Sequence, residues 1–224
     1  MMVKIDRLLP PDQLAIVRRA LDEAPFVDGR LSAGSAASQV KKNREMDQKS
    51  EVFANLSRIL MGALYAHPLF RGAALPLRSA APFFARYGIG ETYGDHIDDP
   101  VMGDERGRFR CDVATTVFLN DPDEYEGGEL VVRTPFGEQR VKLPAGAAVV
   151  YPASSLHRVD PVRRGERLVM VTWTQSMVRD AYKREVLFEL NEAREALLDA
   201  DPTDEKAKKV DHAYTNLVRM WAEV

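Results

Sequence analysis

The chain has 224 residues, a net charge of −3 and a pI near 5.9, and 45% of its residues are hydrophobic. This balance indicates one globular catalytic domain with additions and argues against a nucleic-acid surface, which is normally basic. A single cysteine, Cys111, excludes an internal disulfide framework. Because the N-terminus lacks the apolar core of a signal peptide and no run reaches the ~18 apolar residues of a membrane span, we expect a cytoplasmic protein.

Residues 1–79 are predicted to form a helical segment that packs on a β domain. Prolines at the start of 10–24 predict a short amphipathic helix. Its apolar residues recur at helical spacing: Leu14, Val17 and Leu21. The small and polar residues of 29–39 predict a loop, and a second helix is predicted over about 46–66. His67, directly before Pro68, is expected to be held by local hydrogen bonds at the end of that helix.

A basic run, KKNR at 41–44, lies between these two helices. Such a run either reaches toward an acidic or oxygen-rich substrate or forms a solvated charged surface. Exposed charges are the usual state of lysine and arginine, so we expect the solvated surface here.

Residues 80–176 carry the features of a β domain. Short alternating or apolar runs are separated by turn residues, and no helical pattern interrupts them. The run 113–119 alternates like a strand, and 129–143 is typical of a hairpin. About seven or eight short strands without intervening helices predict an antiparallel sandwich or barrel.

Two potential metal ligands occur in the stretch FFARYGIGETYGDHIDDP at 83–100. His96 and Asp98 are two residues apart, so an extended strand presents both side chains on the same face. A third ligand is available at His157, just after the apolar run 141–152. Two histidines and a carboxylate on facing strands form the facial triad of non-haem Fe(II) oxygenases, which leaves coordination positions open.

The alternatives to this triad are a shifted register and a different metal. Asp95 or Asp99 replaces Asp98 only if the strand slips by one residue, which turns the side chain to the wrong face. Zinc is the chemical alternative, because it also binds histidine and aspartate. A hydrolytic zinc site needs a general base. It does not need a nearby cation that binds a dicarboxylate.

Such a cation is present at Arg167, ten positions after His157 and at the start of the predicted strand RLVMVTWTQ. The guanidinium fork grips a carboxylate through two parallel hydrogen bonds. This suits the carboxylate of 2-oxoglutarate that lies far from the metal. The alternative is a surface ion pair.

Residues 177–224 are predicted to form a C-terminal helical hairpin. The first helix has an apolar stripe made of Val178, Tyr182, Val186, Leu190, Ala193 and Leu197. Asp201 as N-cap, followed by Pro202, predicts the start of the second helix. Its apolar seam consists of Ala207, Val210, Tyr214, Leu217 and Trp221. We expect this seam to pack on its own domain, with self-association as the alternative, and His212 to be solvated.

Four motifs together resemble one family. They are Y-G-x-G-x-x-Y-x-x-H-x-D at 87–98, TTVFLND at 115–121, GGEL at 127–130 and H-x9-R-x5-W at 157–173. This region looks like the Fe(II)/2-oxoglutarate dioxygenase domain of the prolyl 4-hydroxylase type, and the whole chain is similar to the bacterial PKHD-type hydroxylases. The resemblance implies a mainly β fold with flanking helices, in which the core is a double-stranded β-helix, or jelly roll.

The resemblance also assigns roles to residues. It implies that His96, Asp98 and His157 bind iron and that Arg167 binds 2-oxoglutarate. Tyr87 matches a tyrosine that hydrogen-bonds the co-substrate in prolyl hydroxylases, although it also fits a simple core aromatic. Phe118 departs from the pattern, since some relatives have a tyrosine there that contacts the same carboxylate as the arginine.

The activity implied is hydroxylation of an unactivated C–H by an Fe(II)/2-oxoglutarate-dependent dioxygenase, coupled to conversion of 2-oxoglutarate and O2 to succinate and CO2, with ascorbate as reductant. The substrate is a peptide or a small molecule. Two other classes stay open. A non-catalytic metal-binding sensor keeps the ligands but forms no succinate, and an interaction module is indifferent to loss of metal.

The loop 99–110 leaves the metal-bearing strand directly after Asp98, so its root is expected at the cavity mouth. Loops on a rigid scaffold commonly carry recognition. We therefore expect it to act as a substrate flap through Arg106, Arg108 or Arg110, the alternative being an ordinary solvated loop. Tyr93 and Trp173 are further candidates for the surroundings of the metal or the substrate.

Overall fold

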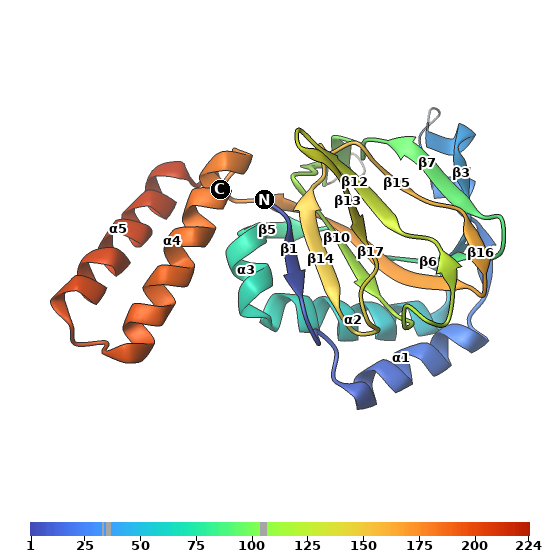
Figure 1. Ribbon diagram of the computed structural model, residues 1–224, viewed down its shortest axis with the longest axis horizontal. Coiled ribbons are helices and arrows are strands. Elements are labelled where there is room, and N and C mark those ends of the chain that lie inside the picture. Colours follow the sequence, from blue (N-terminus) through green and yellow to red (C-terminus); the bar gives the residue numbers. More distant parts are fainter. Residues whose placement is uncertain (33, 35–36, 104–106) are drawn as a thin grey trace.

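The computed structural model describes residues 1–32, 34, 37–103 and 107–224. Two antiparallel sheets face each other, helices α1 to α3 cover the outer face of the larger sheet, and helices α4 and α5 stand to one side as a hairpin (Figure 1). None of the helices in these residues is long and apolar enough to cross a membrane.

The helices include two short 3-10 turns. They are α1 Pro11–Glu23, η1 Gly29–Ser32, η2 Ala37–Gln39, α2 Glu51–Ala66, α3 Pro68–Ala74, α4 Ala181–Ala200 and α5 Glu205–Trp221. The strands are β1 Val3–Ile5, β2 Phe26–Asp28, β3 Lys41–Lys42, β4 Arg44–Met46, β5 Pro76–Ser79, β6 Phe83–Tyr87, β7 Thr92–His96, β8 Val101–Met102, β9 Phe109–Arg110, β10 Val113–Phe118, β11 Glu126–Gly127, β12 Leu130–Thr134, β13 Gly137–Val141, β14 Ala148–Pro152, β15 His157–Val159, β16 Val162–Arg164 and β17 Arg167–Ser176.

The larger sheet runs in the order β1-β14-β10-β17-β6-β4-β2, with β5 also paired to β17. The smaller sheet runs β13-β12-β15-β7-β3, and β11-β16 and β8-β9 form two separate pairs. Apart from the β12-β13 hairpin and the β2-β4 pair, neighbours along each sheet are distant in sequence, as expected for strands that wind between two sheets. The predicted β fold with flanking helices and a jelly-roll core is confirmed.

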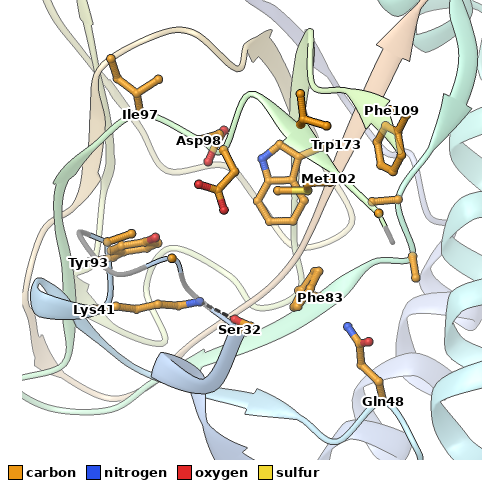
Figure 2. Close-up of a pocket in the computed structure, with 17 residues that line it drawn as sticks. Ser32, Lys41, Gln48, Phe83, Tyr93, Ile97, Asp98, Met102, Phe109 and Trp173 are labelled. Atoms are coloured by element: carbon orange, nitrogen blue, oxygen red, sulfur yellow. Dashed lines mark hydrogen bonds between the residues drawn. The ribbon is translucent and has the colours of Figure 1, made fainter. Parts of the chain in front are cut away.

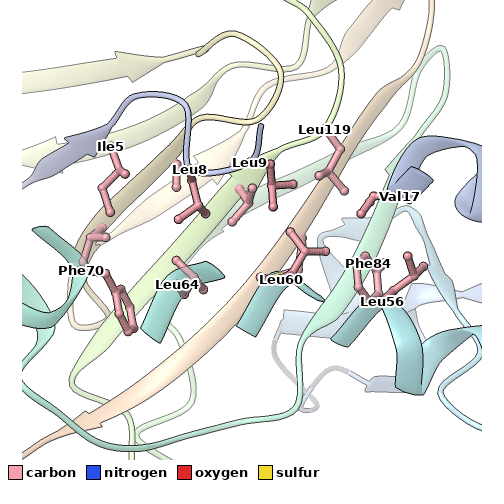
Figure 3. Close-up of a cluster of buried hydrophobic side chains, with 14 of the residues drawn as sticks. Ile5, Leu8, Leu9, Val17, Leu56, Leu60, Leu64, Phe70, Phe84 and Leu119 are labelled. Carbon is pink, nitrogen blue, oxygen red and sulfur yellow. The ribbon is translucent and has the colours of Figure 1, made fainter. Parts of the chain in front are cut away.

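The two faces of β10 show how the core is divided. Alternate residues of a strand point to opposite faces, so Val113 and Val117 enter the cluster under the helices while Ala114 and Phe118 enter the cluster between the sheets. Figure 3 shows the helix-side cluster, in which α2 lies against the sheet. The three buried leucines of α2 occur at intervals of four residues, on one face of the helix: Leu56, Leu60 and Leu64. The second cluster lines the space between the sheets, where the site lies.

The N-terminal segment is less purely helical than predicted. It contributes β1 to β5 to the two sheets, and the expected loop 29–39 contains η1 and η2. Helix α2 begins at Glu51 instead of near 46, because residues 44–46 pair with β2 and β6 as strand β4. Strands of two or three residues have too few positions for a periodic signal, and distant partners decide their state. His67 lies at the predicted helix end, where its ring accepts a hydrogen bond from the Leu69 backbone N–H.

The C-terminal hairpin differs from its predicted pattern in both helices. The predicted stripe of α4 is wrong at Tyr182, which is 81% exposed, while Arg184 and Leu187 form the buried face. Helix α5 begins after Asp204, whose carboxylate caps the backbone N–H groups of Lys206 and Ala207. The predicted packing of the α5 seam on its own chain is confirmed by a small cluster that joins α5 to α4 and to the end of α3: Leu75, Val178, Leu187, Tyr214, Leu217 and Trp221.

Candidate metal and co-substrate site

The sheet register brings the three candidate metal ligands together. His96 at the end of β7 is directly opposite His157 at the start of β15. Asp98 follows two residues later, with its Oδ1 3.9 Å from His96 Nε2 and 3.7 Å from His157 Nε2. All three donor atoms lie within 4.8 Å of one another. This spacing fits a single metal ion between them.

The two imidazoles are oriented by the backbone. His96 Nδ1 lies 2.7 Å from the Gly94 carbonyl oxygen, and His157 Nδ1 lies 2.9 Å from that of Ser155. A carbonyl only accepts, so each Nδ1 carries the proton, and each Nε2 presents its lone pair to the centre. Such hydrogen bonds fix the ring orientation and raise the basicity of a ligand.

The electrostatics also suit a cation. Burial, reinforced by the neighbouring His157, lowers the pKa of His96 to about 4, so the ring is neutral at physiological pH. Burial raises the pKa of Asp98, and His157 partly opposes this effect. Asp98 Oδ2 is a buried atom with no hydrogen-bond partner among the described residues. Two imidazoles with Nε2 directed at the centre and a desolvated carboxylate form a donor set that fits ferrous iron.

Arg167 lies in the same cavity. It opens β17, opposite Tyr87 on β6, and is only 1% exposed. Its guanidinium carbon is 5.0 Å from the ring centroid of Tyr87 and 5.7 Å from that of Phe118. Its Nε has no hydrogen-bond partner in the part of the chain that the structure describes. A buried cation of this kind is costly without an anion, so the arrangement suits a carboxylate ligand.

Further polar groups line this cavity that the sequence did not single out. Thr116 on β10 and Tyr151 on β14 both face it, and the Tyr151 ring is 5.3 Å edge-on from the His157 ring. The alternation of side chains along β14 could have indicated that Tyr151 faces the cavity, since Val149 and Tyr151 point between the sheets while Val150 points to the helices. Thr116 lies within the TTVFLND motif, but the resemblance gave it no role, and Tyr151 lies outside the four motifs.

The neighbourhood of Phe118 contains another hydroxyl. Tyr125 is 1% exposed, and its hydroxyl has no hydrogen-bond partner among the described residues. Gly128, at φ 66°, lets Tyr125 approach Arg167, because a Cβ at this position would be 3.1 Å from both side chains. Tyr125 is therefore a buried phenol close to Arg167, in a chain that has Phe118 where some relatives have a tyrosine.

A larger cavity, of about 370 Å³, adjoins the metal cavity (Figure 2). We call it the chamber. Its walls are largely apolar and aromatic: Phe83, Tyr93, Ile97, Met102, Phe109 and Trp173. The Tyr93 ring stacks on the His96 ring at 3.6 Å, and Trp173 packs edge-on against Phe83 at 5.5 Å. The structure thus places Tyr93 and Trp173 between the two cavities.

Neither of the two described arginines of the loop 99–110 is brought to the chamber. Arg106 lies outside the described residues, and Arg108 is exposed and absent from the chamber lining. Arg110 donates to Asp112 at 2.6 Å and lies 3.6 Å from Glu223. Since Phe109 faces the chamber, strand alternation turns Arg110 away, and the expected substrate contact of Arg110 is not supported.

The basic run 41–44 also differs from the prediction. Lys41 is only 7% exposed, lines both cavities and is paired with the equally buried Glu45. The solvated surface predicted for this run is therefore wrong for Lys41. Pairing of β3 with β7, at Lys41 and Tyr93, brings the lysine here, and that pairing is not visible in the sequence.

The chain is similar both to a superfamily model and to full-length relatives. Residues 82–175 match the model of the 2OG-Fe(II) oxygenase superfamily. The chain is 53% identical over 224 residues to a PKHD-type hydroxylase of Thioalkalivibrio sulfidiphilus, with 100% of both chains covered.

Two solved structures share the fold. A Pseudomonas putida prolyl-4-hydroxylase has a TM-score of 0.54 and 22% identity, covering 78% of this chain and 92% of that one. A prolyl hydroxylase from Trichoplax adhaerens has a TM-score of 0.61 and 15% identity, covering 77% and 82%. Together with the full-length relative, these findings mean that the chain belongs to the PKHD-type hydroxylases and is an Fe(II)- and 2-oxoglutarate-dependent dioxygenase.

Proposed function

We propose that His96, Asp98 and His157 hold the ferrous ion, that Arg167 binds the far carboxylate of 2-oxoglutarate, and that the substrate enters from the chamber. One observation carries this proposal. Three ligand atoms within 4.8 Å of one another share a cavity with a buried arginine whose Nε has no partner among the described residues.

Bound there, iron and 2-oxoglutarate supply the activation of O2 that hydroxylates a C–H while 2-oxoglutarate is decarboxylated to succinate. The chain's own residues orient and desolvate the reactants. The carbonyls of Gly94 and Ser155 hold the imidazole rings, and Arg167 aligns the co-substrate. Tyr87, which is 4% exposed, lines this end of the cavity and shields it from water. Its hydroxyl is proposed to hydrogen-bond the co-substrate.

The substrate is a peptide or a small molecule that places a C–H beside Tyr93 and Trp173. One structural neighbour was solved in complex with a hypoxia inducible factor peptide fragment, which makes peptides one class to test. A chamber of about 370 Å³ accommodates a single side chain or a small metabolite. We also propose a cytoplasmic location, ascorbate as a reductant and self-association through α4 and α5.

The test is an anaerobic titration followed by turnover. Ferrous ion and 2-oxoglutarate added together are expected to produce a visible charge-transfer band, and admission of O2 is expected to release succinate. Profiling of peptides and metabolites for stoichiometric succinate then identifies the substrate. A protein that binds iron but forms neither the band nor succinate would contradict the proposed site.

A further inference from the structure

Lys41 is the one positively charged residue among the described residues that line the chamber. Figure 2 shows it extending beneath Tyr93, with its ammonium group bonded to Ser32. It belongs to the short strand β3, outside the segment that matches the superfamily. Its position at the border of both cavities makes it a candidate for substrate recognition.

The charge of this lysine is already balanced. Lys41 Nζ donates to Glu45 Oε1 at 2.6 Å and to the Ser32 hydroxyl at 2.9 Å, and that hydroxyl donates to the other oxygen of Glu45 at 2.6 Å. Glu45 is 8% exposed, so the pair is shielded from solvent. A buried pair of this kind is close to neutral as a unit, so a second carboxylate beside it gains too little net attraction to offset the cost of leaving water.

One donor of the ammonium has no hydrogen-bond partner among the residues that the structure describes. An ammonium has three N–H groups, and two are used by Glu45 and Ser32. The remaining side of Lys41 Nζ faces the chamber and the Tyr93 ring, whose centroid is 5.3 Å away. A buried donor gains most from an oxygen acceptor, so this N–H is suited to a carbonyl or hydroxyl oxygen.

The rest of the chamber favours the same kind of ligand. Asp99 adds an exposed negative charge at the rim, and the walls are apolar and aromatic. We propose that the chamber selects a substrate with an apolar or aromatic body and a neutral carbonyl or hydroxyl oxygen bound by Lys41, and that Glu45 excludes anions from this position. The inference rests on the proposed function, because it treats the chamber as the substrate site.

Matched probes test the proposal. Phenylacetamide and phenylacetate share one body and differ in the charge of the oxygen-bearing end. Trp173 lines the chamber and Trp221, the other tryptophan, lies on α5, so a Trp221→Phe background makes Trp173 the sole reporter by fluorescence. The protein is loaded anaerobically with ferrous ion and 2-oxoglutarate, which keeps the carboxylate probe away from Arg167.

We expect phenylacetamide to bind at least about tenfold more tightly than phenylacetate, because the carboxylate costs more to desolvate and the charge-balanced pair does not offset that cost. Glu45→Gln leaves the ammonium without its counter-charge and is expected to reverse the preference. Lys41→Met combined with Glu45→Gln removes both charges and is expected to bind the probes with similar, weaker affinity. Lys42→Met, which changes the exposed neighbour on β3, is the matched control and is expected to behave as the parent.

Equal binding, a preference for phenylacetate or no saturable change of emission in the parent protein would overturn the proposal. If Glu45→Gln does not fold, the double variant decides alone, and retention of the parental preference there refutes the role of Lys41. The charge-transfer band recorded in the same sample distinguishes a failure of this inference from a failure of the proposed function. A normal band without discrimination refutes only this inference, whereas a missing band refutes the proposed function as well.

Discussion

The metal cavity and the chamber adjoin each other but are built from different kinds of structure. Paired strands supply the metal cavity, with His96, His157 and Arg167 each at the end of a strand. The chamber shares Phe83, Tyr93 and Trp173 with these strands, but the rest of its wall comes from short segments outside them, namely the stretch from η1 to β3 and the β8-β9 hairpin. The comparison suggests that the strands hold the chemistry rigidly while the short segments set what is hydroxylated.

The largest effect is expected from removing a metal ligand. His157→Ala should abolish iron binding and turnover, because losing a direct ligand costs more than the 10–100-fold typical of groups that only support ligands. Iron content and the charge-transfer band measure it. His212→Ala, an exposed histidine on α5, is the control and should keep both. A normal band in His157→Ala would disprove the assignment of this ligand.

The next effect concerns the co-substrate end of the same cavity. Arg167→Leu should leave iron bound but raise the KM for 2-oxoglutarate by roughly 10- to 100-fold, since it removes a charge-assisted bidentate contact. Arg167→Lys should be intermediate, because an ammonium cannot reproduce the fork. Succinate formation against 2-oxoglutarate concentration gives the KM, with the exposed Arg163→Leu as control. An unchanged KM in Arg167→Leu would show that another residue binds the carboxylate.

A smaller and more selective effect is expected in the chamber. Phe109→Ala removes part of its aromatic wall without touching the strands of the metal cavity. It should preserve both the charge-transfer band and the slow release of succinate that occurs without substrate. Coupled hydroxylation should fall several-fold. The readout is the ratio of hydroxylated product to succinate once profiling has supplied a substrate. Arg108→Gln on the same hairpin is the control, and full coupling in Phe109→Ala would contradict the recognition role.

The smallest effect is expected on the helical hairpin. Tyr182→Ser and Met220→Ser change side chains that are 81% and 73% exposed, so each should alter the free energy of unfolding by about 0.5 kcal/mol or less and leave succinate formation unchanged. Light scattering on the same variants tests the proposed self-association. If both variants keep the oligomeric state of the parent protein, α4 and α5 do not hold an assembly through these residues.

The strand alternation and the motif spacing were sufficient to predict the metal cavity. The two-residue period of an extended chain was enough to predict that His96 and Asp98 share a face, and the offset from His157 was enough to single out Arg167. The geometry agrees with each of these, since all four residues face one space between the sheets. The clustering of these residues could be predicted because each inference rested on a local rule and on a motif that carries several residues at once, while their roles stay a prediction.

Helix boundaries and faces were predicted less well for a physical reason. The α4 stripe was chosen by hydrophobicity, yet Arg184 is buried because its guanidinium donates to the Val178 and Arg179 carbonyls, each at 2.8 Å. Asp201 was expected to cap α5, but its carboxylate instead accepts from Thr203. Residues suited to capping occur at several neighbouring positions, and packing decides which one is used.

The sequence by itself therefore determined the β domain, the reaction class and the candidate metal ligands, because strand period and motif spacing are local properties of the chain. Tertiary structure decided what the chamber is made of. Lys41 and Glu45 are close in sequence, but only the pairing of β3 with β7 and of β4 with β6 buries them beside Tyr93. Long-range pairing of such short strands leaves no periodic trace, so their place at the substrate end of the site is visible only in the folded molecule.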